Sequence, residues 1–254
     1  MLTFVSPRLR EHQHHYYGQR ETILRKYGPV LGGGRRFNRD RNYRQELALL
    51  ARLRPTGRLL DVGTHCGFFL RLARGMSWEL HGVEPSPAAE IAREFFGLDV
   101  RRAYLEEAAF PAESFDVITL IDLIEHEEAP HALLAELRRI LKPDGLIFIK
   151  TPNARYNLFK YRLLHRVLGL QQIEIFDAKE HVVQYTRQTL GRVLQASGLE
   201  IIHELVPYPI QDGAAWKCAL RWVAYLLARA HFSLSGGDFG PFATDLAVVV
   251  RGAA

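Results

Sequence analysis

The feature that most constrains the fold of this chain is the segment from Leu59 to Gly67, an apolar run that passes at once into a glycine turn. Such a run predicts a buried strand, and the residues after the turn are typical of a helix start. Gly63 can adopt a positive φ and leaves its backbone amides open, while Gly67 lets the helix pack close to the sheet. The segment therefore predicts the first strand, turn and helix of an α/β domain.

A second apolar strand, from Leu80 to Val83, follows and ends on Glu84 and Pro85. A carboxylate at the end of this strand can accept hydrogen bonds from both hydroxyls of a ribose. Glycine turns also close ordinary strand-to-helix connections, so Glu84 is what makes this turn specific. Together the two strands predict a site for a cofactor that carries a nucleoside.

The spacing of the turn indicates which cofactor it takes. Dinucleotide sites normally show G-x-G-x-x-G, in which the later glycines seat a pyrophosphate at the helix N-terminus. This chain instead has D-x-G-x-x-x-G from Asp61 to Gly67. Asp61 would place a carboxylate near the turn, which favours a cationic ligand over a diphosphate. S-Adenosylmethionine, which carries a sulfonium and an ammonium, is the better match.

Two later segments extend the pattern. Phe115–His126 is typical of a buried strand that runs into a polar loop, and Ile140–Ile149 of a helix end, a turn and another strand. With them the chain resembles the class I S-adenosylmethionine-dependent methyltransferases, most of all the bacterial small-molecule branch that includes the ubiquinone-biosynthesis O-methyltransferases. The matching residues, spread over roughly 57–206, are Leu59 to Gly67, Gly82 to Pro85, Phe115 to His126, Arg139 to Lys150, Thr151-Pro152-Asn153 and Glu180-His181 through Gly198.

The resemblance implies a Rossmann-like, doubly wound α/β fold whose seven-stranded sheet is mostly parallel, with the final strand antiparallel. We expect a helical, basic extension over residues 1–56 and the methyltransferase domain over 57–254, with lid insertions at about 154–180 and 208–240. A chain of 254 residues suits one such domain. The expected helices lie near 66–74, 86–97, 130–141 and 186–197, and the strands at Leu59–Gly63, Glu79–Glu84, Asp99–Ala103, Phe115–Ile121, Leu146–Thr151, Glu200–Val206 and Thr244–Arg251.

One residue departs from the family turn, which usually reads D-x-G-x-G-x-G. His65 occupies the position of the middle glycine. A β-carbon there would crowd the methionine end of the cofactor unless the loop shifts. Two interpretations stay open: a slightly wider turn tolerates His65, or its side chain contacts the cofactor carboxylate or the substrate.

Ligands of open α/β sheets lie outside the carboxyl ends of the strands, so residues just beyond those ends are the candidates for binding. Asp122 follows the buried strand that begins at Phe115 and would lie beside the cofactor. The expected cofactor-binding residues are Asp61, Gly63, His65, Gly67, Glu84, Pro85 and Asp122.

Two histidines are candidates for catalysis. If the loop after Asp122 begins a helical turn, His126 falls on the same face four residues later, where the carboxylate can orient it. In methyl transfer the protein mainly aligns donor and acceptor and removes the acceptor's proton. We expect His126 or His181 to be that base; alternatively, either histidine holds neighbouring backbone groups or stacks near the adenine.

Two segments outside the core are expected to set specificity. Tyr156–Gly169 alternates aromatic and basic side chains, which suits a lid over an anionic or ring-containing acceptor; an amphipathic helix with a solvated face is the alternative. Trp216–Phe232 has a basic or tyrosine side chain at every fourth residue and an apolar face. That face could pack on the core or a second subunit, or lie on an anionic membrane surface.

The composition excludes several partners. The net charge is +5, but the arginines are scattered and no nucleic-acid-binding module is present, so we expect no nucleic-acid partner. Thr151-Pro152-Asn153 does not match the N-P-P-Y signature of amino-methyltransferases. We therefore expect an oxygen acceptor on a small molecule, glycan or lipid precursor, and leave the oligomeric state open.

Cysteines and histidines give no metal pattern. Cys66 and Cys218 form no disulfide framework, and His12, His14 and His15 lack a further ligand at metal spacing, so we expect no metal. Without a signal peptide or a long uncharged apolar run, we expect a cytoplasmic protein that does not span a membrane. Two other classes remain: a nicotinamide-dependent oxidoreductase, and a non-catalytic S-adenosylmethionine-binding protein.

Overall fold

The computed structural model describes residues 2–3, 19–168 and 181–253. The histidines at 12, 14 and 15 and residues 169–180 of the expected lid lie outside that range. The described helices are α2 (Arg20–Leu31), α3 (Asp40–Leu53), α4 (Phe68–Ala73), α5 (Ala88–Phe96), the 3₁₀ helix η1 (Ile124–His126), α6 (Pro130–Ile140), α7 (Ala154–Leu168), α8 (Arg187–Ala196) and α9 (Ala215–Leu234). The described strands are β1 (Leu2–Thr3), β2 (Gly57–Val62), β3 (Trp78–Val83), β4 (Asp99–Arg101), β5 (Phe115–Ile121), β6 (Leu141–Pro152), β7 (Val183–Gln184), β8 (Leu199–Leu205) and β9 (Asp245–Gly252).

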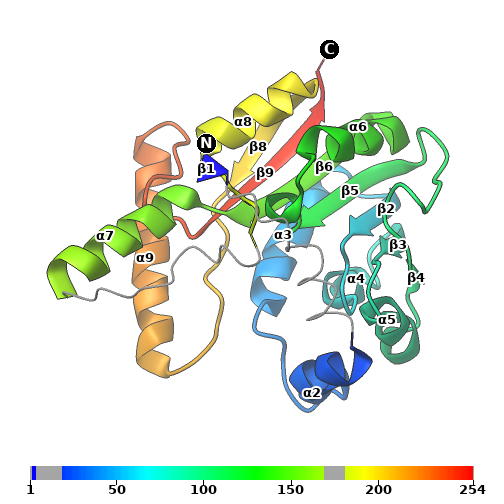
Figure 1. Ribbon diagram of the computed structural model, residues 1–254, viewed down its shortest axis with the longest axis horizontal. Helices are drawn as coiled ribbons and strands as arrows, with labels where there is room; N and C mark the ends of the chain where they lie inside the picture. The colour runs from blue at the N-terminus through cyan, green and yellow to red at the C-terminus, as the bar shows by residue number, and fades with distance from the viewer. Residues whose placement is uncertain (1, 4–18, 169–180, 254) are drawn as a thin grey trace.

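Seven strands form one sheet in the order β4-β3-β2-β5-β6-β9-β8. The strands from β4 to β6 pair in parallel, whereas β9 runs antiparallel to both β6 and β8. This topology, visible in Figure 1, confirms the predicted doubly wound sheet with an antiparallel final strand. β6 begins at Leu141, earlier than the predicted Leu146, because Leu141 pairs with Phe115 before a register shift in β5.

The strands bury both faces, because successive side chains along a strand point to opposite sides of the sheet. In β5, Val117 belongs to one apolar cluster and Ile118 to the other. One cluster is closed by α6, α8 and α9, for example through Leu137 and Leu190. The other cluster is closed by α2, α3, α4 and α5, for example through Leu50. The sheet is thus the middle of three layers.

Helix α3 ties the N-terminal residues to the body of the protein. Its buried leucines share the apolar cluster of β2 and α4. Gln45 donates from Nε2 to the carbonyl of Val206 at 3.2 Å and accepts from the amide of Tyr208 at 2.7 Å. Arg71 of α4 pairs with Asp40 at 2.7 Å. These contacts hold α3 beside the carboxyl ends of the central strands, where Figure 1 shows it.

Helices α7 and α9 lie in the two segments expected to form lids, and both extend from the same side of the sheet in Figure 1. Within the described ranges, no helix combines the length and apolar character that a membrane crossing requires. The cytoplasmic location remains a prediction.

Candidate functional site

The glycine turn after β2 has the backbone that the sequence predicts. Gly63 and Gly67 both have φ of 73°, in the left-handed region that favours glycine. A β-carbon on Gly67 would lie 2.5 Å from Leu98 Cδ1 and 3.2 Å from Ala92 Cβ, atoms that pack against the turn. The absence of a side chain at Gly67 therefore allows the close helix packing that the sequence indicated.

Glu84 closes the same turn from the end of β3. Its carboxylate accepts the amide N–H of His65 at Oε2, at 2.9 Å, and the amide N–H of Ser86 at Oε1, at 3.0 Å. Burial raises the pKa of Glu84, against the hydrogen bonds from Ser86 and His65. A carboxylate offers about four lone-pair positions, so each oxygen can accept one further hydrogen bond. This carboxylate, with two acceptor positions left beside the turn, fits a ribose with two hydroxyls. Pro85 follows Glu84 and is exposed.

His65 adopts the glycine-like backbone that its position requires, with φ of 51°. Its ring lies edge-on to the ring of Tyr27 in α2, with 5.1 Å between centroids. Burial, with a smaller contribution from the charge of Lys26, lowers the pKa of His65 to about 4. The turn thus accommodates His65 by packing its ring on the N-terminal helix α2, which the sequence alone did not indicate.

Asp61 lies beneath the turn rather than at its rim. It is 3% exposed and accepts a hydrogen bond from Thr119 Oγ1 of β5 at 2.6 Å. Burial raises the pKa of Asp61 to about 6, although hydrogen bonds from Thr119 and Thr64 act in the opposite direction. In this position its carboxylate ties β2 to β5, and its predicted contact with the cofactor stays a prediction.

Asp122 lies where β5 ends and has a positive φ of 54°, unusual for a residue with a side chain. Its amide donates to the carbonyl of Lys150 at 2.9 Å, and its carboxylate pairs with the guanidinium of Arg39. Burial alone would raise the pKa of Asp122, but Arg39 and then Lys150 hold it below the ordinary value. Asp122 is therefore a carboxylate that a cation from the N-terminal residues keeps ionised.

Further buried charges lie around Asp122. Lys150 of β6 pairs with Glu46 of α3 at 3.0 Å, and both side chains are almost fully buried. Asp245, at the start of β9, accepts from Thr244 Oγ1 at 2.6 Å, and burial and then the charge of Asp122 raise its pKa. Sequence reasoning missed Arg39, Glu46 and Asp245. A lone lysine within the apolar run of β6 was the available signal that a carboxylate must reach it.

The two candidate bases lie together. The rings of His126 and His181 meet edge-on, with 4.9 Å between centroids. Glu125 accepts from Thr151 Oγ1 at 2.9 Å, and burial and then the Asp122 charge raise its pKa well above the ordinary value. One donor atom from each of Glu125, His126 and His181 lies within 4.8 Å of the others, so this group could hold a metal ion. The charge of His126 contributes to the lowered pKa of Asp122, which places both near the same strand end.

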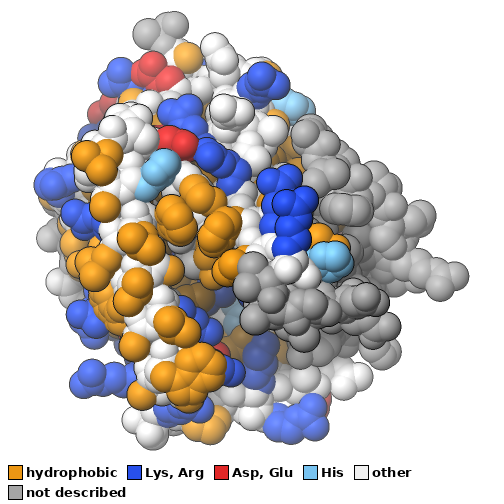
Figure 2. All heavy atoms as spheres, turned by 90° about the vertical axis from the view of Figure 1, so that its left-hand side faces the viewer, with side chains coloured by type: hydrophobic (Ala, Val, Ile, Leu, Met, Phe, Trp, Pro, Cys, Tyr) orange, Lys and Arg blue, Asp and Glu red, His pale blue; other side chains and the backbone are white. Residues whose placement is uncertain are grey.

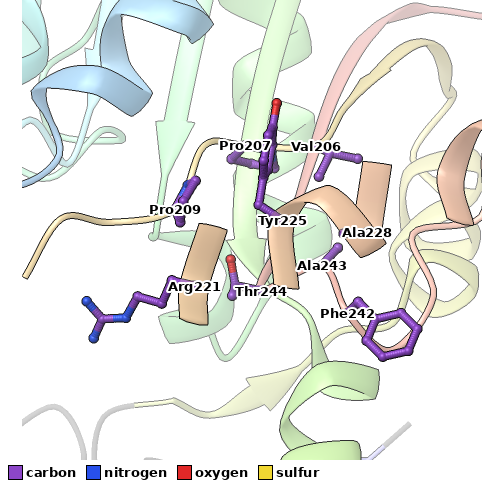
Figure 3. Close-up of a pocket in the computed structure, with 9 residues that line it drawn as sticks. All are labelled: Val206, Pro207, Pro209, Arg221, Tyr225, Ala228, Phe242, Ala243 and Thr244. Carbon is purple, nitrogen blue, oxygen red and sulfur yellow. The ribbon is translucent and has the colours of Figure 1, made fainter. Parts of the chain in front are cut away.

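A small hollow lies between α9 and the start of β9. Figure 3 shows its wall, with Tyr225 and Arg221 coming from α9 and Thr244 from the chain that enters β9. Thr244 is the residue that donates to Asp245, so the hollow adjoins the buried charges around Asp122. The full lining is Val206, Pro207, Pro209, Arg221, Tyr225, Ala228, Phe242, Ala243 and Thr244.

The structure therefore brings the predicted site residues together in two groups. Gly63, His65, Gly67 and Glu84 form the turn, with Asp61 beneath it. Asp122, His126 and His181 form the second group at the ends of β5 and β6.

Known proteins with related sequences match this chain. The family described as a methyltransferase domain matches residues 35–204. The ubiquinone biosynthesis O-methyltransferase of Hahella chejuensis is 30% identical over 117 residues, which are 43% of this chain and 49% of that protein. The chain spans about half the length, or less, of the first curated relatives it matches.

Solved structures share the fold. A Thermotoga maritima protein described as an S-adenosylmethionine-dependent methyltransferase, possible histamine N-methyltransferase, has a TM-score of 0.57 at 18% identity, over 93% of this chain and 98% of that one. The Burkholderia thailandensis 1,6-didemethyltoxoflavin-N1-methyltransferase, solved with 1,6-didemethyltoxoflavin and S-adenosylhomocysteine, has a TM-score of 0.54 at 14% identity, over 85% and 80% of the two chains. At these identities the likeness concerns the fold alone.

Proposed function

The chain belongs to the methyltransferase-domain family, and we propose that it transfers a methyl group from S-adenosylmethionine to an oxygen of a small-molecule, glycan or lipid-precursor acceptor. S-Adenosylmethionine is the cofactor that this family membership assigns, in agreement with the sequence prediction. The observation that carries the proposal is Glu84, whose carboxylate stands beside the glycine turn with acceptor positions left for a ribose.

When bound, S-adenosylmethionine would supply a methyl group on a sulfonium sulfur, and that sulfur would be the leaving group as the neutral thioether of S-adenosylhomocysteine. Gly63, Gly67 and Glu84 are proposed to hold it, with His65, Pro85, Asp61 and Asp122 around it. His126 or His181 is proposed to take the proton of the acceptor hydroxyl as the new oxygen–carbon bond forms. Their closeness to each other and to Asp122 supports this role. A histidine suits the role of a base, because an imidazole can exchange a proton near neutral pH.

The choice of oxygen rests on two observations. Thr151-Pro152-Asn153 lacks the N-P-P-Y signature, and the curated relatives are named as O-methyltransferases.

The experiment has two parts. Calorimetric titration with S-adenosylhomocysteine should show binding, and titration with NAD should show none; the reverse result would assign a nicotinamide oxidoreductase. Transfer of a tritiated methyl group into cell extracts should then label an acceptor, and mass spectrometry of the purified product should place the methyl group on oxygen. A labelled amine would contradict the oxygen acceptor while leaving the family assignment intact.

A non-catalytic cofactor-binding protein is the second candidate, and His65 in the turn is the observation that favours it. Binding of S-adenosylhomocysteine without transfer into any extract fraction would support it.

A further inference from the structure

The outer face of α9 is apolar and uncovered. Trp216 is 63% exposed, Leu220 59% and Leu226 61%, and Val223, Leu227 and Leu234 are exposed as well. Positions 216, 220, 223 and 227 lie on one side of a helix because they are spaced by three or four residues. Tyr225 and Ala228, on the other side, are the residues of α9 that enter the core. The apolar face therefore points away from the protein.

Helices α7 and α9 carry charges of one sign, while Asp212 and Asp238 lie just outside the two ends of α9. Neither α7 nor α9 contains an aspartate or a glutamate. Lys217 and Arg229 lie on α9, and Lys160, Arg162 and Arg166 are exposed on α7. Figure 2 shows hydrophobic side chains along the length of α9 with lysine and arginine side chains on both flanks.

Helices α7 and α9 contribute to one continuous surface. The Phe159 ring of α7 meets the Phe242 ring of the segment after α9, with 5.5 Å between centroids. Arg155 of α7 pairs with Asp238 of the same segment at 2.7 Å. These two contacts tie α7 to the segment that follows α9.

We propose that the outer face of α9, flanked by the cations of α7, docks on the surface of an anionic phospholipid bilayer. A helix with an apolar face and a basic polar face binds in the interfacial plane, with its apolar side chains among the acyl chains and its cations at the headgroups. The excess of positive charge matches an anionic surface. The same charge opposes a second copy of this chain, since two such faces would bring like charges together.

Docking would set the hollow beside the lipid surface. Tyr225, Ala228 and Arg221 line the hollow from the inner side of α9. A membrane on the outer side of the same helix would then lie one helix diameter from the hollow, about 10 Å. Vesicle binding itself does not depend on the proposed methyl transfer, so the two proposals can fail separately.

The test is sedimentation of the full chain with two kinds of vesicle, one of phosphatidylcholine and one of equal parts phosphatidylcholine and phosphatidylglycerol. Wild-type protein should pellet with the anionic vesicles, pellet little with the neutral ones, and release as salt rises. The double variant Leu220→Glu/Leu227→Glu should bind the anionic vesicles at least about tenfold more weakly, since it removes two apolar contacts and adds two repelled charges. Leu53→Glu/Phe95→Glu is the matched control, because it makes the same change at two exposed apolar residues of α3 and α5 and should bind like the wild type.

Calorimetry with S-adenosylhomocysteine on all three proteins should give equal affinities, which shows that the variants are folded. The proposal is overturned if the wild type fails to pellet with anionic vesicles, or if Leu220→Glu/Leu227→Glu binds as tightly as the control. A wild-type dimer that this double variant dissociates would also overturn it and assign the face to a second copy.

Discussion

The two halves of the site are held by different kinds of contact. At the turn, the contacts are backbone amides and glycines: Glu84 accepts two main-chain N–H groups, and Gly67 lies against Leu98 where a β-carbon would clash. At the ends of β5 and β6, the contacts are charged side chains from distant elements, such as Arg39 with Asp122 and Glu46 with Lys150. The first half is a local product of a few neighbouring residues. The second half is assembled from across the chain.

The contrast between backbone contacts at the turn and side-chain contacts at the strand ends suggests how related enzymes could use one cofactor with many acceptors. The contacts of the turn are made mainly by backbone atoms, so we expect substitutions there to change the proposed donor site little. The charged side chains of the second half come from α3 or its N-cap and from the strand ends and can change one at a time, so we expect the proposed acceptor side to vary without loss of the proposed donor site. The predictions below separate the two halves.

The largest expected effect is on the acceptor side. Replacing the proposed base, His126→Ala or His181→Ala, should lower kcat by about a hundredfold to ten-thousandfold, because the acceptor's proton then lacks a positioned base. The affinity for S-adenosylhomocysteine should stay within about twofold, measured by calorimetry. His131→Ala in α6, whose ring contacts Ser197, is the control and should keep the rate. Unchanged kcat in both variants would remove the histidines from the mechanism.

On the turn side, Glu84→Ala should weaken S-adenosylhomocysteine binding by about a hundredfold or more, since two ribose hydroxyls lose a charged acceptor. Glu84→Gln keeps one acceptor oxygen and should lose less. Thermal melts of both variants would separate lost ribose contacts from a loosened turn, because Glu84 also accepts the amides of His65 and Ser86. Equal affinity of Glu84→Ala and wild type would place the ribose elsewhere.

Two buried groups beside the turn should give opposite pH dependence of stability. Burial raises the pKa of Asp61 to about 6. Asp61 therefore adds to the free energy of unfolding below its unfolded pKa, and this contribution is lost as pH rises through about 6. Burial lowers the pKa of His65 to about 4. His65 therefore adds to the free energy of unfolding above its unfolded pKa, and this contribution is lost as pH falls through about 4. Each is worth about 3 kcal/mol over its window, and between about pH 4 and 6 they oppose each other.

Single substitutions should separate the two contributions to the pH dependence of the free energy of unfolding. Relative to wild type, Asp61→Asn should make the free energy of unfolding rise more steeply from pH 4 to 6, and His65→Asn should make it fall. Asparagine suits both sites because it can accept from Thr119 and tolerates a positive φ. Urea midpoints at several pH values measure this. If the free energy of unfolding changes with pH in the same way for wild type and both variants, the pKa shifts of the two groups are contradicted.

The smallest expected effect is at the ion pair between Arg39 and Asp122, which joins the N-terminal residues to the second half of the site. Arg39→Gln removes the cation that keeps Asp122 ionised, and should lower kcat/KM about tenfold with little change in S-adenosylhomocysteine affinity. Arg39→Lys should recover part of the loss. A loss of cofactor affinity equal to the loss of kcat/KM would instead place Arg39 on the donor side.

The sequence predicted the sheet and the turn because their signals are local. The run from Leu59 to Gly67 contains its own strand, turn and helix start, and Glu84 ends the next strand. The seven-stranded sheet and its antiparallel final strand came from the family resemblance, and the structure confirms both.

The charged half could not be predicted in the same way. Arg39 and Asp122 are 83 residues apart, and no local pattern pairs them. Helix α9 shows a second limit: its periodicity identified an apolar face but gave no direction for it, and the structure turns Tyr225 inward and Leu220 outward. A helical pattern states which residues share a side, whereas packing decides which side is covered.

The buried pair of Lys150 and Glu46 has a consequence for anyone who shortens this protein. Lys150 lies in a central strand, and its partner carboxylate comes from a helix before residue 57. A chain cut to begin at β2 would remove the carboxylate that pairs directly with this ammonium and leave Asp122 as the remaining nearby acid, a loss of up to about 3 to 5 kcal/mol, comparable to much of the stability of a whole domain. Engineers who need a minimal catalytic unit should keep α3, or replace Lys150 by an apolar residue in the same step.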